Sequence, residues 1–506
     1  DVANRRAVDL PMPLAPPVTM ATFPENSPLM VAINQLALAN KRILGVTTCG
    51  RGIDCRREKV FMKNAPPSIV EDLGLVIELT TRAIHSHLVS RFGKVLYSST
   101  RAFESTALSP DQPYIVNSDP SVTWRSVCDS VRDCVRWADD RKIASITATS
   151  QRFTTAIIDV HGETTALCPN TDARGAEVED IFTESMGERA YKITGLHPSF
   201  LFSADRLRWF KSFEPKIFEN LKYAMTINGW LYYKLTGSAS EEPSQAAGTF
   251  LFDIRTRSWC EEICRIVGIR EDQLPAIVEY GKLVGYPASE FQESTGIPKK
   301  TPVVMGAGDT QCSGIGSSAL SAGETYVSLG STAPLHVIMS EPLVDRQKRM
   351  WTGCFPIGHE WVLESNSGLC GIVFEWLASS VLQIKKGANV DYNHFEELAV
   401  SARAGSGDVC AFLGPSIMDA KAFTRVPQAA IVLPPLVLGK RPGVPEIARA
   451  CYEDIAFTCR GNMEQMKEVW PEVEPNFRAA GGLSNSEALL QIIADMLFAP
   501  SIDATY

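Results

Sequence analysis

The segment VVMGAGDTQCSGIG, residues 303–316, constrains the fold more than any other part of the chain. An apolar run leads into Gly306 and Gly308, which permit close backbone approach, and then presents Asp309. Ligands of α/β sheets gather beyond the carboxyl ends of strands, so the pattern predicts a strand that ends at a binding site. A carboxylate there can accept a proton from a hydroxyl. The alternative is that Asp309 caps the following small-residue helix, and local chemistry leaves both readings open.

Two common nucleotide motifs do not describe this segment. Its glycines do not have the G-x-G-x-x-G spacing, and the segment lies deep in the chain, which argues against a nicotinamide-dependent dehydrogenase. The sequence contains no G-x-x-x-x-G-K-[ST], which excludes a P-loop. If the chain binds a nucleotide, it uses another kind of site.

Length and composition limit the other classes. With 506 residues, 45% of them hydrophobic, the chain is too long for one ordinary domain. Its net charge of −9 and the lack of a basic stripe predict no nucleic-acid partner. The longest apolar stretch, 429–439, contains Pro434 and Pro435 and is too short for a bilayer, so we expect no membrane segment. Thirteen cysteines without a CxxC pair, and the lack of a signal peptide at the start, predict a cytoplasmic protein.

Periodicity divides the chain into three parts. Residues 1–73 are rich in proline and are predicted to be an extension. Alternating apolar residues from Leu75 to Tyr97 predict an antiparallel meander, and residues 324–339 repeat the pattern of strand, turn and strand. We therefore expect domains at 74–315 and 316–506, two like units that would enclose a cleft.

Further elements follow from the same patterns. The sequence predicts helices near 124–139, 447–470 and 489–497 from apolar stripes at helical spacing. It predicts a strand at 143–149 that pairs with a second strand at 156–160. Residues 150–153 would then lie at the end of a strand.

Four segments together resemble the FGGY family of carbohydrate kinases. GAGDTQCSGIG is similar to the family's G-x-GD segment, and the other three follow its order: NGWLYYKLTG (228–237), FDIRTRSWCEEICRIVGI (252–269) and AAGGLSNSEALLQIIADML (479–497). The resemblance covers roughly residues 74–506. It implies an α/β fold of two duplicated actin-like (ribonuclease H-like) ATPase domains with a central cleft.

The resemblance also implies a site and a reaction. Asp309 would be the general base of an ATP-dependent transfer to a sugar hydroxyl, with Mg²⁺ bridging the phosphates and Glu78 as a ligand. Sugar contacts would come from Gln151, Arg152, Asp172, Arg174 and Asp309. The first phosphate turn would comprise Glu78, Thr80, Thr81 and Arg82, the second Gly330, Ser331 and Thr332, and the adenosine site Gly481, Gly482 and Ser486. For the arginines and Asp172 an ordinary ion pair is the alternative.

Two departures from the family pattern bear on activity. The first turn normally reads Asp-x-Gly-Thr-Thr or Asp-x-Gly-Thr-Ser, but here Glu78 replaces the Asp and Thr80 the Gly, and Thr would be strained at a positive φ. The sequence ends soon after the adenosine motif, so the resemblance implies an incomplete C-terminal domain. A gene-model error and a loss of activity would each explain both departures, and a catalytically silent sugar- or partner-binding protein is the rival function.

The substrate is the least constrained part of the prediction. Residues 150–181 and 363–377 look similar to the autoinducer-2 kinase and xylulokinase-like branches. Several relatives carry a Glu after the Arg of the first motif, where this chain has Phe153. That change removes two hydrogen-bond acceptors and favours a shorter or less hydroxylated substrate. We expect an autoinducer-2-like compound, a ketose or a polyol as the small-molecule partner, and a homodimer is one possible assembly.

Overall fold

The computed structural model describes residues 72–178, 180–387, 389–422, 429–437, 441–473, 477–498 and 502–504. The predicted extension at 1–73 therefore lies outside the described residues, except for Asp72 and Leu73. Within the described part, no helix is both long and apolar enough to cross a membrane.

The first of two six-stranded sheets has the strand order β14-β15-β6-β1-β2-β3. Strands β1, β2 and β3 form an antiparallel meander, which confirms the prediction for this part of the chain. Strand β6 runs parallel to β1 on one side and to β15 on the other. The strands are β1 Leu73–Leu79, β2 Ala83–Ser90, β3 Val95–Ala102, β6 Ile143–Ser150, β14 Leu283–Gly285 and β15 Val303–Val304.

The second sheet has the order β18-β19-β17-β16-β24-β25 and repeats the plan of the first. Three antiparallel strands, β16, β17 and β19, are followed beside β16 by two parallel ones, β24 and β25. The β16–β17 turn therefore corresponds to the β1–β2 turn, and the predicted duplication is confirmed. The strands are β16 Thr325–Ser328, β17 Thr332–Met339, β18 Trp351–Cys354, β19 Trp361–Leu369, β24 Phe477–Ala480 and β25 Ile502–Ala504.

Helix α2, Pro120–Ala138, illustrates how the sequence sets these elements. Asp119 caps it by accepting hydrogen bonds from the backbone N–H groups of Ser121 and Val122, and Pro120 occupies the first turn, where no N–H is needed. Its buried stripe, which includes Val127 and Val131, packs in one core with β1 and with α7, Ile227–Thr236. The predicted helix is confirmed.

The remaining helices lie around the two sheets. The predicted C-terminal helices are α14, Val444–Val469, and α15, Glu487–Leu497, and both share a core with the second sheet. The others are α3 Ile181–Met186, α4 Glu188–Thr194, α5 Ser203–Phe213, α6 Pro215–Glu219, α8 Pro243–Ala247, α9 Glu261–Val267, α10 Ser289–Thr295, α11 Asp309–Gly316, α12 Gly371–Trp376 and α13 Tyr392–Ser401.

One predicted pairing is wrong. Strand β7, Thr155–Asp159, does not pair with β6 but forms a separate three-stranded sheet between β8, Thr164–Cys168, and β9, Leu221–Met225. Two-stranded pairs complete the fold: β4 Thr106–Ser109 with β5 Gln112–Asn117, β10 Ser240–Glu241 with β13 Ala276–Ile277, β11 Phe252–Asp253 with β12 Ser258–Trp259, β20 Lys385–Lys386 with β21 Asn389–Val390, and β22 Cys410–Phe412 with β23 Ala430–Val432.

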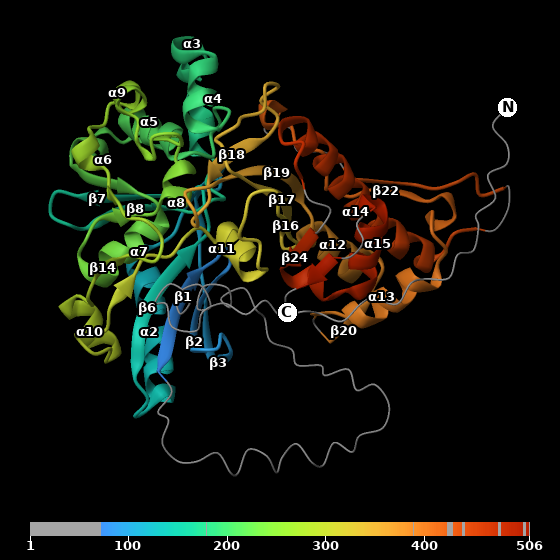
Figure 1. Cartoon of the computed structure of the whole chain (residues 1–506), viewed down its shortest axis with the longest axis horizontal. Helices are drawn as coiled ribbons and strands as arrows, with labels where there is room; N and C mark the ends of the chain where they lie inside the picture. Colours follow the sequence, from blue (N-terminus) through green and yellow to red (C-terminus); the bar gives the residue numbers. More distant parts are fainter. Residues whose placement is uncertain are drawn as a thin grey trace.

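We call the first sheet with its helices through α10 the first lobe, and the second sheet with α12 to α15 the second lobe (Figure 1). Helix α11 lies between them, and its Cys312 and Ile315 share a core with Tyr326 and Ile338 of the second sheet. A Cβ added to Gly314 of this helix would lie 2.7 Å from the ring of Tyr326. Gly308, which precedes α11, forms a parallel bridge with Ser150 at the end of β6 in the first sheet, while the helix itself packs on the second.

Candidate active site

Asp309 is the first residue of α11, just beyond the carboxyl end of β15. Gly308 occupies the cap position, so Asp309 does not cap the helix in the way considered from the sequence; its Oδ1 accepts a hydrogen bond from the N–H of Thr310 at 2.8 Å. Burial raises the pKa of Asp309, and the positive charge of Arg152 opposes that rise.

The two glycines before Asp309 allow the close approaches that the sequence predicted. A Cβ on Gly306 would lie 2.2 Å from the carbonyl oxygen of Ala148, and one on Gly308 would lie 2.6 Å from Oε1 of Gln311 and 3.1 Å from the side chain of Arg152. Because both neighbours Ala148 and Arg152 belong to β6 or its end, the glycines bring Asp309 against that strand terminus.

Arg152 forms a buried ion pair that joins the two lobes. Its Nη2 lies 3.0 Å from Oε1 and 2.8 Å from Oε2 of Glu364, on β19 of the second sheet. His336 of β17 approaches the same carboxylate, with Nε2 3.5 Å from Oε2. Burial alone would raise the pKa of Glu364, but Arg152 and His336 outweigh it and hold the pKa at about 2. Glu364 is therefore an anion that fixes Arg152 beside Asp309.

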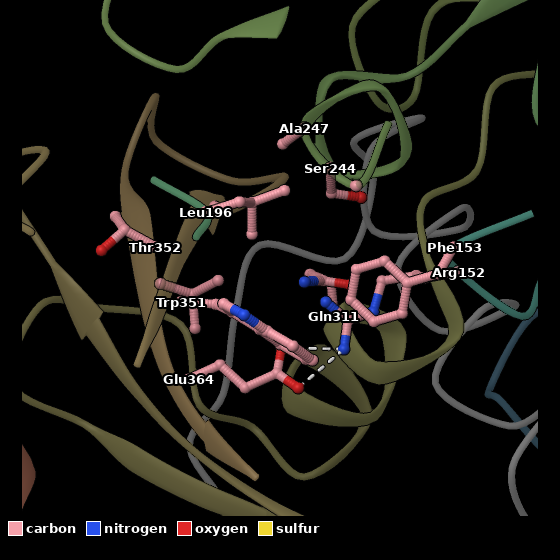
Figure 2. A pocket seen from close by; sticks show the side chains of 12 residues that line it. Arg152, Phe153, Leu196, Ser244, Ala247, Gln311, Trp351, Thr352 and Glu364 are labelled. Atoms are coloured by element: carbon pink, nitrogen blue, oxygen red, sulfur yellow. Dashed lines mark hydrogen bonds and ion pairs between the residues drawn. The ribbon is translucent and has the colours of Figure 1, made fainter. Parts of the chain in front are cut away.

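A hollow opens where these residues meet (Figure 2). The picture places Trp351, Thr352 and Glu364 on one side and Arg152 and Phe153 on the other. The hollow is lined by Arg152, Phe153, Leu196, Ser244, Ala247, Gly248, Gln311, Trp351, Thr352, Gly353, Val362 and Glu364.

Gln151 connects the end of β6 to the first predicted phosphate turn. It is buried, its Nε2 donates to the carbonyl oxygen of Thr80 at 3.4 Å, and its Oε1 accepts from the N–H of Asn170 at 3.3 Å. Asn170 also donates to the hydroxyl of Thr81 at 3.1 Å. Gln151 therefore supports the turn, while Arg152 beside it lines the hollow.

Thr80 is accommodated without the strain expected from the sequence. It does not have a positive φ. Its hydroxyl accepts a hydrogen bond from the N–H of Ala83 at 3.0 Å and donates one to the carbonyl oxygen of the same residue at 3.0 Å. Arg82 in this turn is exposed, and Glu78 before it is buried, 3.9 Å from His87. The two hydrogen bonds of the Thr80 hydroxyl therefore stabilise this turn.

The second turn lies against the predicted adenosine segment. The N–H of Leu329 donates to Ala480 at 2.7 Å, and its carbonyl accepts from Leu483 at 3.1 Å. Gly481, with φ +98, fits only because it lacks a side chain, since a Cβ would lie 2.5 Å from the carbonyl oxygen of Leu329. A Cβ on Gly482 would meet nothing within 4 Å, so one face of this loop is open.

The other members of these two groups lie close by. Ser331 follows Gly330 in the turn, and its carbonyl oxygen accepts from the N–H of Cys370 at 2.9 Å. Thr332 begins β17. Ser486 caps α15 by accepting from the N–H of Leu489 and donates to the hydroxyl of Tyr452 at 3.1 Å. The structure therefore brings the second turn and the glycines together.

Asp172 and Arg174 do not line the hollow. Asp172 is fully buried and lies 2.8 Å from Nε of Arg174 and 3.1 Å from Nε of Arg206. Arg174 also donates to Val116 and Asn117 and lies against the rings of Trp209 and Phe210. The geometry is that of the ion pair considered as the alternative, here buried and shared among three charges.

Sequence reasoning missed the half of the hollow that the second lobe supplies. Glu364 and Trp351 lie far along the chain from Arg152, and His336 behind Glu364 had no recognisable motif. Glu364 does lie in the LESNSG segment used for the choice of branch, and Gln311 in GAGDTQ. Those two segments are the sequence signals from which Glu364 and Gln311 could have been identified.

Two sheets of one plan flank a hollow that Arg152 and Glu364 line. Residues 73–316 match the "FGGY family of carbohydrate kinases, N-terminal domain", and residues 325–502 match the corresponding C-terminal domain. The chain belongs to the FGGY family of carbohydrate kinases.

Individual relatives agree with this assignment. The chain is 30% identical over 425 residues to "Putative sugar kinase YoaC" of Bacillus subtilis (strain 168), with 84% of each chain covered. It is 25% identical to the autoinducer-2 kinase of Salmonella typhimurium, over 83% of this chain and 81% of the relative. In fold it resembles a xylulose kinase from Lactobacillus acidophilus, with a TM-score of 0.74, 22% identity and 86% of both chains covered.

Proposed function

We propose that this carbohydrate kinase transfers the γ-phosphoryl group of ATP to a hydroxyl of a neutral sugar or polyol, such as a ketose or an autoinducer-2-like compound. The observation that carries the proposal is the position of Asp309 shortly after β15, where the preceding Gly308 lies against Arg152 and Arg152 lines the hollow between the lobes. The autoinducer-2 kinase and xylulose kinase among the similar proteins support the substrate class.

In the proposed reaction, Asp309 accepts the proton of the substrate hydroxyl as that oxygen attacks the γ-phosphorus in line, and the bond to ADP breaks. The raised pKa makes Asp309 a stronger base than an exposed aspartate once it is ionised. Arg152, held by Glu364, is placed to donate to substrate oxygens on the side facing the hollow. Gln151 keeps the strand end and the first phosphate turn in one arrangement.

The nucleotide would lie along the two corresponding turns. We assign phosphate contacts to Thr80, Thr81 and Arg82 in the first turn and to Gly330 and Ser331 in the second. Gly481 and Gly482 would face the adenosine, and the open face at Gly482 supports this. Ser486 would contribute by capping α15 beside them.

Mg²⁺ is part of the proposal, and Glu78 is the carboxylate that would hold it together with water and phosphate oxygens. Among the described residues no group of three or more His, Cys, Asp or Glu could hold a metal by itself, and Mg²⁺ commonly uses only one or two carboxylates with water and phosphate oxygens. Glu78 lies near the carboxyl end of β1, on the opposite side of β6 from β15, which precedes Asp309. Bound there, the ion would neutralise charge on the phosphates.

The rival function is a catalytically silent binding protein, and the structure removes one of the two sequence observations that favoured it. It relied on strain at Thr80, and the turn forms without a positive φ at that residue. The cytoplasmic location and the homodimer stay predictions.

The test is ADP release with a panel of ketoses, polyols and an autoinducer-2-like compound. We expect turnover by the wild type, and a decrease of roughly 100- to 10,000-fold for Asp309→Asn, the usual scale for loss of a general base. The variant should retain sugar binding and an unchanged melting temperature. Unchanged turnover in Asp309→Asn would remove the assigned role, and no ADP with any substrate would favour the silent binding protein.

A further inference from the structure

The chain between β15 and α11 contains one residue more than the strand beside it. In the parallel ladder with β6, Val304 pairs with Thr147, and the next bridge joins Gly308 to Ser150. Three residues of one strand therefore lie opposite two of the other, which is a β-bulge. Bulges are rare between parallel strands, and they interrupt the ladder of backbone hydrogen bonds. We call residues 305–307 the bulge.

The hydroxyl of Tyr232, on α7, replaces ladder bonds that the bulge interrupts. It accepts hydrogen bonds from the N–H of Gly306 at 2.6 Å and from the N–H of Ala148 at 2.9 Å. Its own proton can be donated to the carbonyl oxygen of Ala148, at 2.9 Å, or to that of Val304, at 3.0 Å. Tyr232 is fully buried, and burial raises its pKa to about 12, so the hydroxyl keeps its proton at pH 7. One side chain thus binds β6 to the bulge.

Two further hydroxyls bind the remainder of this segment. Thr149 of β6 donates to the carbonyl oxygen of Ala307 at 2.7 Å. The N–H of Gly308 donates to the hydroxyl of Ser244, on α8, at 3.0 Å, and that hydroxyl donates to the buried carboxylate of Glu242. Buried backbone groups need such partners, because water cannot reach them. Side chains from three elements therefore determine the course of the bulge.

The bulge sets where Asp309 begins α11. Asp309 follows Gly308, and an extra residue in a strand bends the chain and redirects the side chains next to it. Tyr232 belongs to the core that β1, β6 and α7 share, and it is not among the residues that line the hollow. Its hydroxyl can therefore affect the site only through the backbone that it binds.

We propose that Tyr232 is a positioning residue of the phosphoryl transfer, whose hydroxyl fixes the bulge and thereby holds the carboxylate of Asp309 in place beside the end of β6. The proposal rests on the proposed function. A displacement of about 1 Å at a reacting group can cost roughly 100-fold in rate, so a hydroxyl that fixes the backbone three residues before the base has a measurable effect.

The first measurement is the steady-state kinetics of Tyr232→Phe, which removes one oxygen atom. We expect kcat to fall by roughly 10- to 100-fold, the scale for a misplaced reacting group. The KM for ATP should stay that of the wild type, because Tyr232 lies in neither of the proposed phosphate turns. Tyr233→Phe is the matched control and should leave both constants unchanged. Tyr233 is half-buried and packs against Tyr223, and among the described residues its hydroxyl makes no hydrogen bond to β6 or β15.

The second measurement places Tyr232→Phe in the Asp309→Asn background. If Tyr232 acts through the base, its removal should lower turnover there by less than about 3-fold, since the effect that it supports is already absent. A side chain that only stabilises the fold would lower turnover by the same factor in both backgrounds. If Tyr232→Phe does not fold, Thr149→Val takes its place in this comparison, because it removes another hydroxyl that binds the bulge, and it should depend on Asp309 in the same way.

Amide hydrogen exchange observes the bulge without any turnover. In Tyr232→Phe the N–H of Gly306 loses its acceptor, so it should exchange at least about 10-fold faster than in the wild type. The same amide should be unchanged in Tyr233→Phe. Unchanged exchange of Gly306 in Tyr232→Phe would show that the hydroxyl does not hold the bulge.

The outcomes distinguish this inference from the proposed function. A wild-type kcat in Tyr232→Phe, or equal losses in the two backgrounds, would overturn the positioning role and leave the kinase activity standing. Full turnover in Asp309→Asn would overturn the role of the base and the inference with it. No ADP release by the wild type with any substrate would overturn both, although the exchange of Gly306 would still show whether Tyr232 holds the backbone.

Discussion

Among the described residues, two of the buried ion clusters differ in their relation to the site. Arg152 and Glu364 line the hollow, whereas Asp172, Arg174 and Arg206 form a cluster apart from its lining. Removing one partner of a buried ion pair is costly in either place, because the remaining charge stays out of water without a counter-charge. Arg152 of the first pair also lies against Gly308, the residue before Asp309, where a Cβ would come within 3.1 Å of its side chain.

For the first pair, Glu364→Gln should lower the free energy of unfolding at pH 7 by about 3 kcal/mol, the scale for breaking a buried ion pair. Folding lowers the pKa of Glu364 from 4.5 to about 2, so its ionisation stabilises the fold fully above pH 4.5. That contribution is lost as the pH falls towards 2, and the gap between wild type and variant should therefore shrink. Urea unfolding across this pH range measures the gap.

The control for that measurement is Glu341→Gln, at an exposed position on the surface. Its unfolding free energy should stay within about 0.5 kcal/mol of the wild type at pH 7, the usual range for surface substitutions. A gap for Glu364→Gln that stayed constant from pH 7 to strongly acidic conditions would contradict the assignment of an ionised Glu364.

For the second cluster, Asp172→Asn should cost about 3 to 5 kcal/mol of stability, since it leaves two arginines with one fewer buried counter-charge. The KM for the sugar should not change in protein kept folded at low temperature, because Asp172 does not line the hollow. Chemical unfolding and initial-rate kinetics give the two values. A raised KM with unchanged stability would instead support the sugar contact that the family resemblance implied.

At the scale of single elements, we expect the two glycines of the loop after β24 to differ in their effects on folding and on the proposed nucleotide binding. Gly481→Ala should destabilise the protein by about 1 to 3 kcal/mol, because it places a side chain at a positive φ and against Leu329. Gly482→Ala is the matched substitution, and its Cβ meets nothing within 4 Å. It should leave the melting temperature unchanged and raise the KM for ATP. An unaltered KM for ATP in Gly482→Ala would place the nucleotide elsewhere.

Helices and strands with a clear apolar periodicity were predictable from sequence, but the elements with which they pack or pair often were not. Apolar spacing identified α2, α14 and the β1 to β3 meander, because each buries one face within a short stretch of chain. The pairing of β6 with β7 was predicted wrongly, since a strand pattern specifies a buried face and not the neighbouring strand. Strand β6 instead takes β15 as a neighbour, from more than 150 residues further on.

The residues of the candidate site divide in the same way, into those that local motifs predicted and those that only the packing of the lobes brings together. Asp309 and Arg152 belong to local motifs and were found, whereas Glu364 and Trp351 reach the hollow only because the lobes pack together. Thr80 was expected to strain its turn, but its own hydroxyl closes the turn in a conformation that a sequence pattern does not specify. The sequence alone could not predict the contacts between segments that lie far apart along the chain.

At the scale of the whole molecule, the lobes share buried contacts and should unfold together. The hydroxyl of Tyr191 donates to Met350 at 2.7 Å, and the indole of Trp361 to Ile254 at 2.7 Å, in addition to the Arg152–Glu364 pair. We expect a single calorimetric transition that ATP with Mg²⁺ shifts upward by ligand linkage. Two resolved transitions, with only one moved by the nucleotide, would mean that the lobes unfold independently.

The place of α11 limits how such chains can be recombined. The first family match ends at residue 316, with this helix, and the second begins at 325, yet the apolar face of the helix belongs to the sheet of the second match. A hybrid assembled from halves of two relatives would join one parent's α11 to the other parent's Tyr326 and Ile338. The crossover point of such a hybrid must therefore keep α11 together with the second sheet, on which it packs, rather than follow the boundary between the two family matches.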